Sequence, residues 1–205
     1  MPDRTNNKGS RTRASILDQA ARLATVEGLD RLSIGQLAGA TGLSKSGLYA
    51  HFGSKEQLQL ATIERAREIF LEEVVRPALA TRRGSRRLIA LCDAFLSHVE
   101  RKVFPGGCFF SAASVEVGSR KGRVHDVIAR NQAEWLALLE RLVSEAQESG
   151  ELARDIDRPQ LAFELHALVV GANNAFILSG NSKVLEQARR GVRERVDRAA
   201  AAAAA

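Results

Sequence analysis

The amino-acid sequence predicts an all-α protein. Apolar residues recur at intervals of three and four along most of the chain, as on one face of a helix, and no stretch shows the alternation of a half-buried strand. Between residues 33 and 57, helix start signals follow one another closely and are separated by glycines. We therefore expect about nine helices, divided between an N-terminal three-helix domain and a larger C-terminal helical domain.

Composition restricts the class of protein and its partners. A chain of 205 residues with 45% hydrophobic residues fits either one large helical domain or a small domain followed by a larger one. The net charge of +6 favours an anionic partner. The only cysteines, Cys92 and Cys108, are too few for a disulfide framework. The polar start, M-P-D-R-T-N-N-K, lacks the apolar core of a signal peptide, so we expect a cytoplasmic protein.

The chain begins with a polar, basic segment. We expect residues 1–9 to form a flexible arm, which serves either as a solubilising tail or as a contact to nucleic-acid phosphates or a minor groove. A first helix from about Ser10 to Glu27 follows and ends at Gly28. Its buried stripe consists of Ile16, Ala20, Leu23 and Ala24.

Three serines begin the next three helices. They are Ser33, Ser44 and Ser54, and the first and third are followed three residues later by glutamine, which is the spacing of a capping box. Gly42 and Gly53 end the first two of these helices, since glycine adopts the left-handed conformation without steric cost. The sequence therefore predicts two short helices joined by a tight turn, directly before a longer helix.

Such a pair usually crosses at a steep angle and holds out its second helix, as in the helix-turn-helix. In the second helix, Leu48 and Phe52 lie four residues apart and anchor it inward. The outer side is left with small, polar and aromatic groups that suit phosphates or base edges: Lys45, Ser46, Gly47, Tyr49 and His51. On spacing alone, a solvated helical hairpin is an alternative.

The run T-G-L-S-K-S-G-L-Y-A-H-F-G-S-K-E-Q-L, residues 41–58, resembles the signature of the tetracycline-repressor (TetR) family of transcriptional regulators. Its most specific part is Leu48-Tyr49-x-His51-Phe52-x-x-Lys55, and the similarity extends back to about residue 10. The resemblance implies a DNA-binding domain over residues 10–55 that reads a palindromic operator in double-stranded DNA.

The resemblance also implies roles for individual residues. Tyr49 and His51 would position phosphates, and Lys45 would reach a base edge. Gly47 would allow close approach because it lacks a side chain. The full set of expected DNA-binding residues is Ser33, Ser44, Lys45, Ser46, Gly47, Tyr49, His51 and Lys55.

The third of these helices runs from Ser54 to about Arg76, where Pro77 is expected to stop it. Its length allows its first half to pack on the small domain and its second half on the next domain. The basic loop R-R-G-S-R-R at residues 82–87 is better interpreted as a solvated connection than as a nucleic-acid contact. Further helices are expected at about 85–102, 109–117, 124–149, 159–179 and 182–198, and residues 199–205 form a low-complexity alanine tail.

The helix at 159–179 is apolar on two sides, which favours one side against its own core and the other against a partner. Its Glu164, His166, Asn173 and Asn174 would be costly in lipid, so we expect a buried helix in a soluble protein and no membrane partner. The resemblance implies a homodimer built on this helix and the next one. We assign the interface to the stripe Leu161, Leu165, Leu168, Ala172 and Ala175, and the second apolar stripe is Phe163, Ala167, Val170 and Ile177.

The resemblance further implies that residues 56–198 form a ligand-sensing and dimerisation domain whose small-molecule ligand releases the DNA. A mainly apolar cavity with a few polar groups is what such a site requires, although each residue taken singly is more readily a core residue. We expect an apolar or aromatic ligand, with the pocket lined by Phe70, Phe95, His98, Phe109, Asn131, Trp135, Asn173 and Phe176.

Other functions have less support in the sequence. The four histidines and two cysteines are scattered, and no catalytic or phosphate-binding motif occurs, so we expect no enzyme, no metal and no cofactor. Cys108 and His166 are interpreted as core residues rather than as a reactive thiol and a ligand. The alternative function is a helical adaptor that keeps the motif as scaffold and binds a partner protein instead of DNA.

Overall fold

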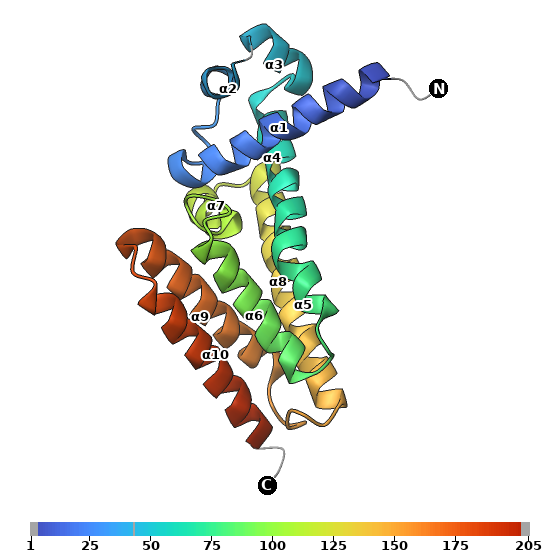
Figure 1. Ribbon diagram of the computed structural model, residues 1–205, viewed down its shortest axis with the longest axis vertical. Coiled ribbons are helices and arrows are strands. Elements are labelled where there is room, and N and C mark those ends of the chain that lie inside the picture. Colours follow the sequence, from blue (N-terminus) through green and yellow to red (C-terminus); the bar gives the residue numbers. More distant parts are fainter. Residues whose placement is uncertain (1–3, 43, 202–205) are drawn as a thin grey trace. The chain divides into compact units, whose positions relative to one another are not determined.

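The computed structural model describes residues 4–42 and 44–201, including the side chains of residues 12–42 and 44–200. Every regular element in these ranges is helical, which confirms the all-α prediction (Figure 1). The elements are α1 (Arg4–Glu27), α2 (Ile34–Thr41), α3 (Lys45–Phe52), α4 (Lys55–Phe70), the π-helical turn η1 (Leu71–Val75), α5 (Arg76–Ala80), α6 (Ser85–Glu100), α7 (Phe109–Val117), α8 (Arg123–Glu148), α9 (Arg158–Ser179) and α10 (Lys183–Ala201).

Both terminal helices are longer than the sequence suggested. α1 begins at Arg4, inside the segment expected to be a flexible arm, and residues 1–3 of that arm lie outside the described residues. α10 continues to Ala201, and residues 202–205 of the expected tail likewise lie outside them. Ala199 is buried, and its carbonyl accepts a hydrogen bond from the N–H of Ala153 at 3.1 Å. The start of the alanine run is therefore part of a packed helix.

The described chain divides into two compact units. The first contains the residues up to Ile69 together with Phe104–Ala129, and the second contains Phe70–Val103 and the residues from Arg130 onward. These units differ from the two domains expected from chain order, because the segment 104–129 packs with the N-terminal helices. α8 accordingly contributes its first residues to one unit and its remainder to the other.

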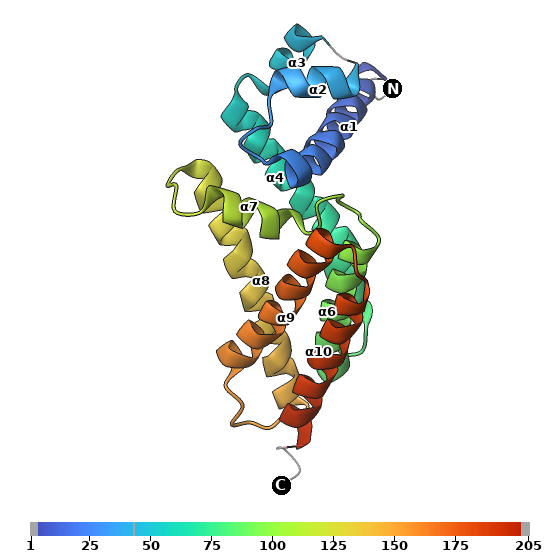
Figure 2. The same cartoon turned by 90° about the vertical axis from the view of Figure 1, so that its left-hand side faces the viewer.

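The first unit has one apolar core to which α1, α2, α3, α4, α7 and the start of α8 all contribute. In the predicted stripe of the first helix, only Leu23 is partly rather than fully buried. Figure 2 shows α2 and α3 as two short helices beside α1. The large buried residues of this core include Ile16, Leu29, Leu37, Leu48, Leu58, Ile63, Phe104 and Phe109.

The loop before α7 lies directly against the end of α1. The N–H of Gly106 donates a hydrogen bond to Thr25 Oγ1 at 3.1 Å. A Cβ atom at position 106 would lie 1.8 Å from the carbonyl oxygen of Thr25, far inside any contact distance. Only glycine allows the two backbones to come this close.

The helix that begins after Ser54 does not end at Pro77, so that prediction was wrong. α4 passes into η1, in which the N–H of Arg76 donates to the carbonyl of Leu71, and helix continues as α5. Pro77 lies in the first turn of α5, where its missing N–H removes no needed hydrogen bond. The π-helical turn also places two consecutive residues, Val74 and Val75, in buried positions.

The second unit is a helical bundle. α10 packs on α9 and α6, and α6 also packs on α9, η1 and α5. Figure 2 shows α9 and α10 side by side. Fully buried side chains of this bundle include Leu88, Leu91, Leu96, Leu139, Leu142, Leu161, Leu165, Val169 and Leu185.

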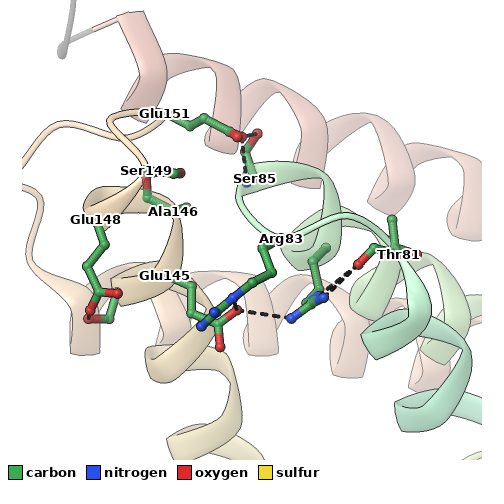
Figure 3. A network of polar contacts seen from close by, with 10 residues as sticks. Thr81, Arg83, Ser85, Glu145, Ala146, Glu148, Ser149 and Glu151 are labelled. Carbon is green, nitrogen blue, oxygen red and sulfur yellow. Dashed lines mark hydrogen bonds and ion pairs between the residues drawn. The ribbon is translucent and has the colours of Figure 1, made fainter.

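A network of charged and polar side chains holds the loop before α6 against the C-terminal end of α8 (Figure 3). The carboxylate of Glu145 accepts from Arg83 at 3.3 Å and from Arg87 at 3.2 Å, and Arg87 also donates to the carbonyl of Thr81. Glu151 accepts from both the N–H and the hydroxyl of Ser85, at 2.8 and 2.6 Å. The basic loop connects two helices, and unlike the solvated loop that the sequence predicted, its Arg87 is half-buried and ion-paired.

Candidate functional site

The pair α2 and α3 is built by local caps. Ser33 Oγ accepts from the N–H of Gln36 at 3.2 Å and begins α2, which ends at Gly42 with φ of 67°. Ser44 Oγ accepts from the N–H of Gly47 at 3.1 Å and begins α3. Gly53, with φ of 70°, ends that helix. The predicted starts and ends of both helices are confirmed.

α3 has one side in the core and one side open to solvent. Leu48 is fully buried and Phe52 is 6% exposed, as predicted for the anchors. On the open side, the ring of Tyr49 is exposed by 56%, which is unusual for an aromatic residue without a partner surface. The other predicted DNA-binding residues exposed on or beside α3 are Ser44, Lys45, Ser46, His51 and Lys55.

Two glycines lie close to side chains at the start of α3. A Cβ atom on Gly47 would lie 3.2 Å from Ser44 Oγ, so a larger residue would press on the cap of α3. A Cβ atom on Gly35 would lie 3.7 Å from Lys45 Cε, so the lysine stem extends along the first turn of α2. The cap of α3 therefore favours glycine at position 47, independently of the expected close approach to DNA.

The structure adds one residue, Arg13 of α1, to the surroundings of α3. The guanidinium of Arg13 lies over the ring of Phe52, 5.3 Å from its centroid. Sequence spacing gives no signal for this contact, because it joins α1 to α3.

Two family models match the chain. "Bacterial regulatory proteins, tetR family" matches residues 16–62, and "Tetracyclin repressor-like, C-terminal domain" matches residues 84–192, just over half of the chain. The chain belongs to the TetR family. The family is one of transcriptional regulators rather than of enzymes, and nothing in the matches favours the adaptor alternative.

Individual relatives support the same assignment for this TetR-family regulator. The HTH-type transcriptional repressor ComR of Escherichia coli K12 is 27% identical over 169 residues, which cover 78% of this chain and 76% of ComR. A TetR regulator from Chloroflexus aurantiacus has a TM-score of 0.86 at 29% identity, over 93% of this chain and 96% of that chain. AibR, crystallised with isovaleryl coenzyme A and operator DNA, has a TM-score of 0.71 at 26% identity, over 88% and 95%.

Four of the expected ligand-pocket residues form an aromatic cluster in the second unit of this regulator. The ring of Phe70 lies 5.4 Å from Trp135, 5.9 Å from His98 and 6.1 Å from Phe95, with edge-to-face geometry in each pair. Trp135 Nε1 donates to His166 Nδ1 at 3.1 Å, and Gln132 lies 2.9 Å from the other nitrogen of that ring. His166 is thus hydrogen-bonded, but it is half-buried rather than the core residue that the sequence suggested.

The remaining expected pocket residues are more scattered. Phe109 belongs to the core of the first unit, where its ring lies 6.1 Å from Phe104. Asn173 is buried and donates to Asn174 on the same helix, and Phe176 is buried with the Lys102 ammonium 6.0 Å from its ring centroid. Asn131 is half-buried on α8.

An open groove of about 430 Å³ lies over η1, α5 and α6. Its lining contains none of the expected pocket residues and consists of Glu72, Glu73, Pro77, Asp93, Ala94, Ser97 and Arg101.

Most of the stripe on α9 that we expected at a dimer interface is buried within the chain's own second unit. Leu161, Leu165 and Ala172 are buried within the second unit itself, and Leu168 packs toward Gly191 of α10. Only Ala175 in that set is exposed. The opposite stripe is the open one, with Phe163 exposed by 59%, Ile177 by 38% and the neighbouring Leu178 by 91%. Because both sides of this helix are apolar, the sequence does not indicate which side packs in the chain's own core.

Cys92 and Cys108 are both free thiols inside the protein. Both are buried; burial raises the pKa of Cys92 to about 12 and also raises that of Cys108. Among the described residues, no three His, Cys, Asp or Glu side chains come together as a metal-binding group. Cys108 is therefore a core residue, as expected from its sequence context.

Proposed function

We propose that this protein is a cytoplasmic repressor that binds a palindromic operator as a homodimer, with α3 of each subunit in the major groove. The observation that carries the proposal is the solvent-exposed side of α3, where Lys45, Ser46, Tyr49 and His51 project from a helix held by its own caps. A protein with net charge +6 also gains from counterion release on binding DNA.

The exposed residues have different roles in this proposal. Tyr49 and His51 contact phosphates and fix the register of the protein on the duplex, whereas Lys45 donates to a base edge. Ser44 and Ser33 cap the two helices and leave their N-terminal turns open to phosphate oxygens. Lys55 adds a phosphate contact from the start of α4.

The DNA-contact assignment is tested on a duplex that the wild-type protein selects from a randomised library. Lys45→Ala should weaken binding by roughly 1–3 kcal/mol and relax the preference at one base position. Tyr49→Ala should weaken binding similarly on all sequences, because it removes a phosphate contact. Lys183→Ala, which removes the same charge from the exposed start of α10, is the matched control.

Unchanged affinity in both α3 variants would exclude this face as the DNA contact. Failure of the wild-type protein to enrich any sequence would instead remove operator recognition itself and favour the adaptor alternative.

The dimer in this proposal uses the exposed stripe of α9. Phe163, Ala167 and Ile177 offer apolar area, and Gly171 between them has nothing within 4 Å of a built Cβ atom. Small residues beside large apolar ones allow two helices to approach closely. A monomer would leave this area in water, which favours a covered face.

The ligand in this proposal is a small apolar or aromatic molecule bound in the second unit, beside the cluster of Phe70, Phe95, His98 and Trp135. Aromatic rings together with a few polar groups, such as the His166 and Gln132 pair, are the usual lining of a small-molecule site. Binding there would favour a state that does not fit the operator, and the DNA would be released.

A further inference from the structure

The link between α1 and α2, residues 28–33, determines where the helix-turn-helix begins. It starts at Gly28, whose φ of 97° ends α1, and leads to the cap residue Ser33. Leu29 and Leu32 are buried at 1% and 2% exposure, so the link is anchored in the core of the first unit. Any shift of this link displaces α2, and α3 with it.

A single carboxylate of α7 holds this link by its backbone. Glu116 Oε2 accepts from the N–H of Leu29 at 2.6 Å, and Glu116 Oε1 accepts from the N–H of Asp30 at 2.9 Å. A Cβ atom on Gly28 would lie 2.7 Å from Glu116 Oε1, so the absent side chain leaves the space that the carboxylate occupies. Hydrogen bonds from neutral donors to a carboxylate are about twice as strong as those between neutral groups.

Two further side chains hold the same residues, one from α4 and one from the loop after α7. Gln59 of α4, itself buried, donates to the carbonyl of Leu29 at 3.0 Å and to Asp30 Oδ1 at 3.3 Å. Arg120, just beyond α7, donates both to the carboxylate of Asp30 and to the carbonyl of Glu116. The backbone of the link is therefore bonded on its N–H side by α7 and on its carbonyl side by α4.

We propose that Glu116 is a positioning residue for DNA recognition, which fixes the helix-turn-helix in its DNA-competent arrangement through the two N–H groups of Leu29 and Asp30. This role rests on the DNA-binding function of α3 and adds a residue that has no contact with DNA itself. Loss of the carboxylate would leave the DNA-contact residues intact but let the helix pair move relative to α1 and α4. Specific binding, which needs an exact register, would suffer more than non-specific binding.

The test compares Glu116→Gln with wild type on the selected duplex and on a random-sequence duplex. The amide has the same shape, but its NH₂ group opposes one of the two backbone donors. We expect the affinity for the selected duplex to fall by about tenfold or more, with little loss on random DNA. Glu116→Asp, which keeps the charge and shortens the reach, should give the same selective loss.

Glu64→Gln is the matched control. It removes one carboxylate from the exposed side of α4, in the same unit. Removing a negative charge from a DNA-binding protein should by itself raise its affinity for both duplexes, so the change expected for Glu116→Gln has the opposite sign.

The amide protons of Leu29 and Asp30 report directly on their hydrogen bonds to Glu116. In wild type, the amide protons of Leu29 and Asp30 should exchange slowly, and in Glu116→Gln both resonances should shift and exchange faster. Wild-type affinity of Glu116→Gln for the selected duplex would overturn the proposal, and so would equal losses on both duplexes or unchanged Leu29 and Asp30 resonances. Failure of the wild-type protein to select any sequence would count against operator recognition instead.

Discussion

His98 is a histidine without solvent exposure, in the aromatic cluster of the second unit. Its ring meets the edge of Phe70 at 78°, with 5.9 Å between centroids. Burial lowers its pKa from 6.5 to about 4; the nearby Glu73 opposes this shift and Arg101 adds to it. The folded protein thus holds this imidazole neutral where an unfolded chain would bind a proton.

This pKa difference makes the stability depend on pH. Because the pKa of His98 is lower in the folded state, the unfolded state binds more protons between pH 6.5 and 4. The stability that the neutral His98 contributes to the folded protein is therefore complete above about pH 6.5 and is lost as the pH falls toward 4. We predict that wild type loses roughly 3 kcal/mol more over this range than His98→Leu. Urea unfolding followed by Trp135, the only tryptophan, measures this at several pH values.

Equal pH dependence in wild type and His98→Leu would contradict the buried neutral histidine. The carboxylates of Glu145, Glu151 and Glu164, whose pKa values are lowered by their hydrogen-bond and charge partners, weaken the protein only below their ordinary range near 4.5. They are common to both proteins, so their contribution cancels in the comparison.

Residue-level predictions succeeded where the cause is local. Ser33, Ser44 and Ser54 each bond to an N–H three residues ahead, and the sequence alone contains both partners. Glu116 escaped notice because its partners, Leu29 and Asp30, lie 87 and 86 residues away in the chain. No spacing rule connects such positions.

At the scale of elements, α9 has the two apolar sides that the sequence predicted, but the side expected to meet a partner is the one buried within the chain's own unit. By length and composition it could cross a membrane, yet one side of it packs on α6 and α10. The other side is open. Helical periodicity reveals two apolar stripes. Which stripe packs in the core and which one faces a partner depends on tertiary packing, which periodicity does not show.

This orientation gives a matched pair of substitutions on α9. Ala167→Asp places a carboxylate on the exposed stripe and should give a folded monomer, weakening the proposed dimer by about 3 kcal/mol or more because the charge would be buried unpaired. Leu165→Asp places the same group in the core, where Leu165 is fully buried, and should prevent folding of the second unit. Sedimentation velocity and circular dichroism distinguish the two outcomes.

A folded Ala167→Asp protein that still sediments as a dimer would move the interface away from this stripe. A wild-type protein that stays monomeric at micromolar concentration would remove the dimer itself.

The helical segment over residues 55–80 shows a second limit of sequence-based prediction. Proline disfavours the interior of an α-helix, which is why the sequence predicted a stop at Pro77, and that prediction was wrong because helix continues to Ala80. The chain avoids the clash by changing its hydrogen-bond register in η1, five residues with no composition that marks them in advance. A π-helical turn is rare enough that the ordinary rule predicts a stop.

At the scale of the whole molecule, chain order was a poor guide to packing. The class of fold and the family follow from the sequence, because caps and periodicity are repeated along it. The division into units does not, since Phe109 and the rest of α7 follow α6 in sequence but share a core with α1 and α4. One expected pocket residue was therefore assigned to the wrong set of neighbours.

The proposed regulation requires that a ligand in one unit changes the DNA affinity of the other. We predict that an apolar or aromatic ligand quenches or shifts the Trp135 fluorescence and weakens operator binding by a coupling free energy of roughly 1–3 kcal/mol. A panel of aromatic carboxylic acids and acyl-CoA thioesters tests this, with Trp135→Phe as the control for direct optical effects. By reciprocity, operator DNA must weaken ligand binding by the same factor.

A compound that changes the tryptophan signal and leaves the affinity for DNA unchanged would show a binding site without regulatory coupling. A panel without any effect on fluorescence, melting temperature or DNA affinity would count against a site beside Trp135.

The close approach of Gly106 to Thr25 has a consequence for the history of the sequence. A side chain at position 106 is excluded by lack of space and not by the backbone conformation of Gly106. The atom in the way is the backbone carbonyl oxygen of Thr25, which no side-chain rotation can move. Every other amino acid carries a Cβ, so we expect even Gly106→Ala to disrupt this contact. Gly39, by contrast, has empty space around it. Divergence among descendants of this chain is therefore free to change the surface of α2 while this one joint with α1 stays fixed.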